Sequence, residues 1–258
     1  MNIKKHGQIA IWVIIAVVLV ASIVFFFLLE RKPGFERVPV VSSSFDVESF
    51  MDNCLADYVE EGVDAMLSQG GFISPRNTVF FDGENIEYIC ENIGFYEPCI
   101  QQHPMLISEM EDEIKNYVLP KINDCFNDME REFERRGSEV SFVSVNSSLS
   151  VEFGEDRIFL YVDRELTIRK DADVRSFEEL RIELVNPIYN LAKIAVEISS
   201  QEAKYCYFEF VGHDILYPRY KITKYVMSEP TKIYTIRDIK SGKEMNIAVR
   251  SCAIPAGF

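Results

Sequence analysis

The chain has 258 residues, a formal net charge of -14 and a hydrophobic content of 48%. Because a domain typically takes roughly 150 residues, this length suits one large domain or two small ones. The composition excludes a disordered tail, a collagen-like repeat and a multi-span membrane protein. The sequence pI near 4.8 argues against a nucleic-acid partner, since phosphates require clustered Lys and Arg.

An uncharged apolar segment near the N-terminus predicts a single transmembrane helix. It runs from Ile9 to Leu29, and at about 1.5 Å rise per residue it would cross a hydrocarbon core of about 30 Å. A cleaved secretory signal would have a shorter apolar stretch of about 7–15 residues, closed by a small-residue cleavage site. No such site ends this segment, and a buried core helix is the alternative interpretation.

The cysteines indicate on which side of the membrane the chain lies. Basic residues flank the span on both sides and nearly balance, so they do not decide its orientation. All six cysteines follow the span, and their even number fits disulfides in an oxidising exterior. We therefore expect a single-pass protein of the cell membrane, with the lipid bilayer as one partner and most of the chain on the exterior face. The expected parts are a cytoplasmic N-terminus (1–7), a transmembrane anchor (8–30), a stalk rich in Pro, Gly and Ser (31–45) and an exterior domain (46–258), with candidate divisions near residues 137 and 204.

The segment Lys4-Lys5-His6-Gly7-Gln8, followed by the apolar helix, resembles the class III signal of archaeal prepilins. In that family a peptidase cuts after the Gly, and the apolar helix then packs into filaments. The resemblance implies processing between Gly7 and Gln8 and a pilin-like filament subunit. It covers only residues 4–29, and it departs from the pattern at His6, at Trp12 and at Pro33, which interrupts the helix. An uncut signal anchor is the alternative.

Apolar residues at three- and four-residue spacing predict three long helices in the exterior part. The first covers residues 47–67 and ends at Gly70-Gly71 through a left-handed turn. The second covers 108–136, and Pro120 should kink or split it. The third covers 176–203 and has Pro187 inside it.

Short stretches of alternating apolar and polar residues predict antiparallel strands. A hairpin is expected over residues 78–90, with its turn at Asp82-Gly83. A meander is expected over 139–170, with a turn at residues 154–156. Four further strands are expected at 206–211, 221–227, 232–239 and 245–253. The fold class is therefore α+β: a single N-terminal transmembrane helix, then an exterior domain of two to three long helices and antiparallel sheets.

Six cysteines permit 15 pairings, and the sequence alone does not choose among them; the expected elements suggest three pairs. Cys90 and Cys99 are close in sequence, so closing the loop between them costs little entropy. Cys54 and Cys125 fall on the apolar faces of the first two helices, and Cys206 and Cys252 would tie the first and last strands of the C-terminal region. Each disulfide would stabilise the fold by about 2–4 kcal/mol. Metal-binding and redox thiols are alternatives that the absence of a CxxC motif weakens.

No catalytic, cofactor-binding or metal-binding motif is present, so the chain is more simply interpreted as a non-enzyme without a cofactor. Adjacent residues on a strand point in opposite directions, so the adjacency of His213 and Asp214 does not imply a catalytic pair. We expect His213-Asp214 to form a polar turn. The acidic residues at 109 and 111–113 are interpreted as a solvated helix start, which the helix dipole favours. His103 stands apart from any motif. Asn146 begins an N-glycosylation sequon.

These features predict a membrane-anchored surface protein whose disulfide-stabilised extracellular domain acts in binding or assembly. Its partner would be an unknown surface protein or a second copy of the chain. A pilin-like filament subunit processed after Gly7 is the first alternative. The second is an anchored extracellular hydrolase whose site gathers residues that are far apart in the sequence, such as His103 or His213 with carboxylates.

Overall fold

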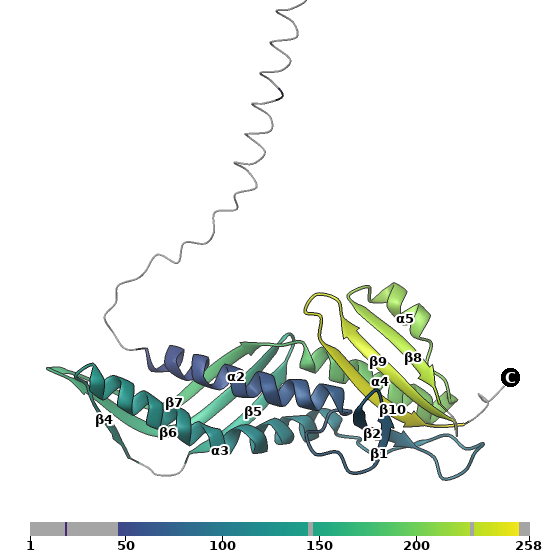
Figure 1. Ribbon diagram of the computed structural model, residues 1–258, viewed down its shortest axis with the longest axis horizontal. Coiled ribbons are helices and arrows are strands. Elements are labelled where there is room, and N and C mark those ends of the chain that lie inside the picture. Colours follow the sequence, from purple (N-terminus) through teal and green to yellow (C-terminus); the bar gives the residue numbers. More distant parts are fainter. Residues whose placement is uncertain (1–18, 20–45, 144–146, 228–229, 253–258) are drawn as a thin grey trace, which may run out of the picture. The chain divides into compact units, whose positions relative to one another are not determined.

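The computed structural model describes Leu19 and residues 46–143, 147–227 and 230–252 (Figure 1). The chain divides into two compact units, residues 1–44 and 45–258, and the second unit shows no division near residue 137 or 204. Apart from Leu19, the expected anchor at 8–30 lies outside the described residues. Among the helices that are described, none is long and apolar enough to cross a membrane.

Two long helices cover one face of a four-stranded antiparallel sheet (Figure 1). The helices are α2 (Val47–Ser68) and α3 (Leu106–Arg135), close to the predicted bounds. The strands are β4 (Glu139–Phe142), β5 (Ser148–Gly154), β6 (Arg157–Lys170) and β7 (Asp173–Val185). β6 is central: β4 and β5 pair with it, and so does β7 along nearly its whole length. α3 is not split at Pro120, because buried residues on both sides of the proline pack against the same core.

A second, mixed sheet is built from both ends of the second unit. Its strands are β1 (Thr78–Phe81), β2 (Glu84–Glu91), β3 (Ile100–Gln101), β8 (Tyr220–Val226), β9 (Thr231–Asp238) and β10 (Glu244–Arg250). Their order is β1-β2-β10-β9-β8, with β3 also paired to β2. β2 and β10 run parallel, with Tyr88 opposite Ala248. The expectation of purely antiparallel sheets is therefore wrong at this one junction, which joins segments far apart in the sequence.

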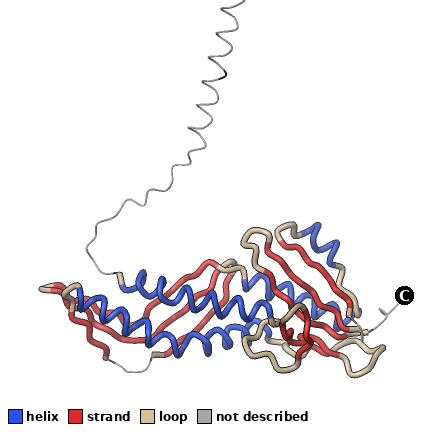
Figure 2. The backbone as a smooth tube through the Cα atoms, in the orientation of Figure 1, coloured by secondary structure: helices blue, strands red, loops and turns tan. Residues whose placement is uncertain are grey.

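Two further helices pack on the second sheet (Figure 2). α4 (Ile188–Tyr205) packs on β9 and β10, and the short α5 (Phe210–Leu216) packs on β8. One cluster of buried side chains continues from α2 and α3 through α4 to both sheets. The α+β class is thus confirmed for the second unit.

Two sequence predictions are wrong: the start of the third helix, predicted at 176–203, and the strand predicted at 206–211. Residues 173–185 form β7, and the third helix begins only at Ile188, after Pro187. Strand pairing with β6 overrides helix propensity there, and alternate residues such as Leu180 and Ile182 are buried. No strand forms at 206–211, because the Glu209 side chain accepts a hydrogen bond from Gly212 N and starts α5.

An arginine joins the two sheets. The Arg219 guanidinium donates to Asp156 Oδ2 at 2.7 Å, from the β5–β6 turn, and to Asp238 Oδ1 at 2.9 Å, at the end of β9. Asn190 of α4 donates to Asp156 Oδ1 at 2.9 Å. Hydrogen bonds from Arg219, the largest effect, and from Ser241 together lower the pKa of Asp238 to about 2. The buried Asp238 carboxylate is therefore ionised over almost the whole pH range.

Gly70 and Gly71 end α2 as predicted. Gly71 N donates to the Met66 carbonyl at 2.9 Å, and Gly70 has a φ of +84°. A Cβ at Gly70 would lie 2.9 Å from Glu87 N, in β2. The end of the helix thus approaches the strand more closely than any side chain allows.

The close approach at Gly70 is tested by comparison with Gly83, which also has a positive φ but has open space around it. Gly83→Ala should lower the free energy of unfolding by about 1 kcal/mol, through backbone strain alone. Gly70→Ala adds the clash with β2 and should cost about 2–4 kcal/mol. Denaturant unfolding measures both values, and equal costs would contradict the close approach.

The linkage at Asp238 predicts how stability changes in acid. Its folded pKa lies below the unfolded value of about 3.9, so its stabilisation is complete above pH 4 and is lost as the pH falls toward 2. At pH 7, Asp238→Asn should lower the free energy of unfolding by about 2 kcal/mol. The difference from the wild-type protein should shrink toward zero near pH 2. Unfolding curves between pH 2 and 7 measure it, and a constant difference would contradict the ion-pair account.

Candidate functional site

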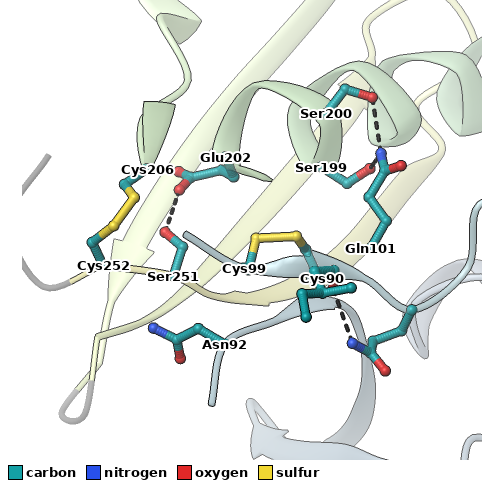
Figure 3. The surroundings of a disulfide bond; sticks show 12 residues. Cys90, Asn92, Cys99, Gln101, Ser199, Ser200, Glu202, Cys206, Ser251 and Cys252 are labelled. Carbon is teal, nitrogen blue, oxygen red and sulfur yellow. Dashed lines mark hydrogen bonds between the residues drawn. A yellow bond between two sulfur atoms is a disulfide. The ribbon is translucent and has the colours of Figure 1, made fainter. Parts of the chain in front are cut away.

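The six cysteines form three disulfides and leave no free thiol. The pairs are Cys54–Cys125, Cys90–Cys99 and Cys206–Cys252, with Cα–Cα distances of 5.9, 5.4 and 5.4 Å. These are the pairs that the sequence favoured. The first joins α2 to α3, and the other two lie near the C-terminal end of α4 (Figure 3). Within the described ranges, no group of three or more His, Cys, Asp or Glu could hold a metal ion.

The Cys90–Cys99 disulfide closes a loop, residues 91–98, whose conformation is fixed from within. The Asn92 side-chain amide donates to the Gly94 carbonyl at 2.7 Å and to the Glu97 carbonyl at 3.0 Å. At the base of the loop, Asn92 N donates to the Arg250 carbonyl of β10 at 2.8 Å. The Arg250 side chain also pairs with Glu91 at 2.8 Å. The disulfide, the buried amide and β10 together hold this closed loop in one conformation.

The closed loop displays large apolar side chains to solvent. Ile93 is 91% exposed, Tyr96 78% and Phe95 58%. Large apolar side chains that are exposed close together are typical of interaction sites in folded domains. Because the loop is ordered before binding, a partner would not have to supply the free energy of ordering it. The arrangement suits protein recognition, in which rigid aromatic side chains act as anchors.

A buried polar cluster lies beside the closed loop, at the end of α4 (Figure 3). The Lys232 ammonium donates to Glu202 Oε2 at 2.6 Å, to the Cys206 carbonyl at 2.7 Å and to Ser251 Oγ at 3.0 Å. Tyr234 donates to the other oxygen of Glu202. Burial raises the pKa of Tyr234, and the charge of Glu202 raises it further, so this hydroxyl remains a donor. All three ammonium protons are used and the cluster is buried, which indicates a structural role.

Hydrogen bonds connect β3, directly after the closed loop, to α4. Just beyond Cys99, the Gln101 side chain donates to Ser199 Oγ at 3.0 Å and to Ser200 Oγ at 2.9 Å (Figure 3). β3, which follows the loop directly, is therefore fastened to the same helix end that carries the buried cluster.

His103 lines a separate acidic cavity of about 260 Å³. Its Nδ1 lies 2.6 Å from Glu109 Oε2, and its Nε2 lies 3.5 Å from Glu87 Oε1. The ring packs on Phe72 with a centroid distance of 4.4 Å. The cavity thus gathers a histidine with carboxylates, which is the arrangement that the hydrolase alternative required.

The acidic start of α3 differs from the solvated helix start that was expected. Glu111 Oε1 accepts a hydrogen bond from Phe153 N at 2.7 Å, and Glu113 Oε2 accepts one from Ile73 N at 3.0 Å. Burial raises the pKa of Glu111. These carboxylates fasten α3 to β5 and to the segment after α2, which periodicity within one helix cannot reveal.

His213 and Asp214 form no polar turn and do not act as a pair. Both lie in α5. Asp214 accepts a hydrogen bond from Ile222 N at 3.0 Å and pairs with Lys221 at 2.5 Å, which covers part of the outer edge of β8. The His213 ring is buried against Phe208.

The remaining predicted site residues, Gly7, Gln8 and Asn146, lie outside the described residues. Processing after Gly7 and glycosylation of Asn146 stay predictions. No family model matches the chain, and neither does any curated protein or solved structure.

The closed loop and the buried cluster were missed from the sequence for different reasons. The loop left a signal: Phe95 and Tyr96 lie between two cysteines that were expected to pair. The cluster left none, because Glu202, Lys232 and Ser251 come from separate elements and have no characteristic spacing.

Breaking the buried pair should be far more costly than breaking an exposed one. Glu202→Gln leaves the Lys232 charge without its carboxylate and should lower the free energy of unfolding by about 3–5 kcal/mol. Glu244→Gln removes a solvent-exposed pair with Arg237 and should cost under about 1 kcal/mol. Adding Lys232→Met to Glu202→Gln should restore part of the loss. Denaturant unfolding measures all three, and a cost for Glu202→Gln no larger than that of the control would contradict the structural role.

Proposed function

We propose that the chain is a membrane-anchored surface protein whose exterior domain binds another surface component through the closed loop. The observation that carries the proposal is the display of Ile93, Phe95 and Tyr96 on a loop that a disulfide and Asn92 hold rigid. The covalent closure and the two hydrogen bonds of the Asn92 amide hold the loop in one conformation while these side chains remain exposed.

The location rests on the cysteines and on the apolar N-terminal segment. Three disulfides without a free thiol indicate an oxidising environment, such as the cell exterior. The uncharged segment from Ile9 to Leu29 is long enough to anchor the chain in a bilayer. An anchor followed by the Pro- and Ser-containing stalk at 31–45 would hold the closed loop outside the membrane surface.

A pilin-like subunit is the main alternative within this proposal, with a second copy of the chain as the partner. The two versions differ at the N-terminus. Mass spectrometry of the mature protein would find Gln8 as the first residue if a prepilin-type peptidase acts. An intact Met1 or Asn2 would contradict the pilin version and leave the surface-binding version in place.

Site-specific photo-crosslinking in the native host tests the role of the closed loop. A benzophenone amino acid replaces Tyr96 in one variant and Tyr225, an exposed tyrosine of β8 outside the loop, in the other. We expect covalent adducts from position 96, fewer from 225, and a loss of the position-96 adducts when Ile93→Asp is added. Adducts of twice the chain mass would identify self-association, and other masses a different surface protein.

Two outcomes of the crosslinking would overturn the proposal. The first is that position 96 yields no adduct in cells whose protein carries all three disulfides. The second is that positions 96 and 225 yield the same adducts in the same amounts.

A further inference from the structure

A cleft of about 270 Å³ lies between α4, α5, the start of β8 and the β5–β6 turn. One face of α4 lines it with Asn190, Lys193, Ile194 and Glu197, which recur at three- and four-residue spacing. Ile194 is buried and the charged groups stand at the opening. The cleft does not involve the closed loop, so it is independent of the function proposed above.

The framework of the cleft is rigid on the side of the β5–β6 turn. Glu155 lines the cleft directly before Asp156, the residue that Arg219 and Asn190 both bind. The Asn190 amide group is thereby committed to Asp156, and its carbonyl oxygen remains as an acceptor beside the cleft. The ion pair that joins the two sheets therefore also fixes two lining residues.

Aromatic rings form the other wall. Tyr217 is 54% exposed, and its ring lies against His213 with a centroid distance of 4.9 Å. Tyr220 adds a second phenol ring at the start of β8. Burial raises the pKa of Tyr220, so its hydroxyl remains a donor at neutral pH. These rings offer apolar faces with polar groups at their edges.

His213 has an unsatisfied nitrogen at the base of the cleft. The residue is 7% exposed, and its Nδ1 is buried with no hydrogen-bond partner among the described residues. An unpaired buried N–H is rarer and more costly than an unpaired lone pair, so we assign the proton to Nε2. The neutral ring then carries one N–H donor among the lining residues of the cleft.

We propose that this cleft binds one pyranose ring of a saccharide. The lining mixes acceptors and donors, with two carboxylates at Glu155 and Glu197 and an ammonium at Lys193. Sugar hydroxyls both donate and accept, and the C–H face of a pyranose can lie on an aromatic ring such as Tyr217. The volume of about 270 Å³ lies just below the range of about 300–1,000 Å³ for pockets that hold drug-sized ligands, which suits a single ring. The two carboxylates disfavour a phosphate, and Lys193 disfavours an amine.

Saturation-transfer NMR and calorimetry on the full chain test the site, in a detergent without a sugar head group such as a dodecyl amine oxide. The probes are free glucose, galactose, mannose and N-acetylglucosamine and their methyl glycosides. We expect at least one of these sugars to bind. Binding of the methyl glycosides would assign the site to the end of a glycan chain, and binding of reducing sugars alone would assign it to free sugars.

Three variants locate the binding. Tyr217→Ala should weaken it by about tenfold through loss of the ring face. Tyr217→Phe, which keeps the ring, should retain most of the affinity. Tyr225→Ala removes a tyrosine of similar exposure (56%) outside the cleft and should leave binding unchanged. Failure of all eight probes to bind the wild-type protein, or equal binding by Tyr217→Ala, would overturn the proposal.

Discussion

One apolar core, shared by α2, α3, α4 and both sheets, is the constraint on which residues 46–252 depend. Because β2, near the start of the unit, pairs in parallel with β10, its last strand, the core closes only when segments distant in sequence have come together. Two of the disulfides lie in or against this core: Cys54–Cys125 joins the two helices of one layer, and Cys90–Cys99 is buried in the core. Cys206–Cys252 holds segments near the end of α4. The exposed apolar side chains of the closed loop do not belong to this core, so the stability of the core does not depend on them.

Local patterns predicted most of the elements because each strongly periodic segment buries one face. α2, α3 and the β1–β2 hairpin match their predicted ranges closely. Residues 173–185 were misassigned because pairing with β6, which is a tertiary interaction, decides their conformation. The strand predicted at 206–211 does not form, because the left-handed conformation of Cys206 and the N-cap at Glu209 direct the chain into α5. The parallel pairing of β2 with β10 could not be predicted, because no sequence spacing indicates a pairing between segments so far apart in the chain.

Among the candidate sites too, those with a local sequence signal could be predicted, and those formed by tertiary packing could not. The disulfide pairs followed from which faces the cysteines occupy, and the closed loop could have been recognised from Phe95 and Tyr96 between two of them. The cleft could not, because Glu155, Asn190 and Tyr217 come from three different elements that tertiary packing brings together. Arg219 shows the same limit: its two aspartate partners belong to different sheets, and its number of hydrogen bonds follows only from the fold.

The disulfides link the fold to the proposed location, so the thiol state of the protein in its native cell tests the account most directly. Cells are treated with an alkylating reagent, and the intact protein is analysed by mass spectrometry with and without prior reduction. The account predicts that none of the six cysteines reacts until the protein is reduced. Free alkylation of Cys90, Cys99 and the other four without reduction would place the domain on the cytoplasmic side and contradict both the stapled closed loop and the exterior location.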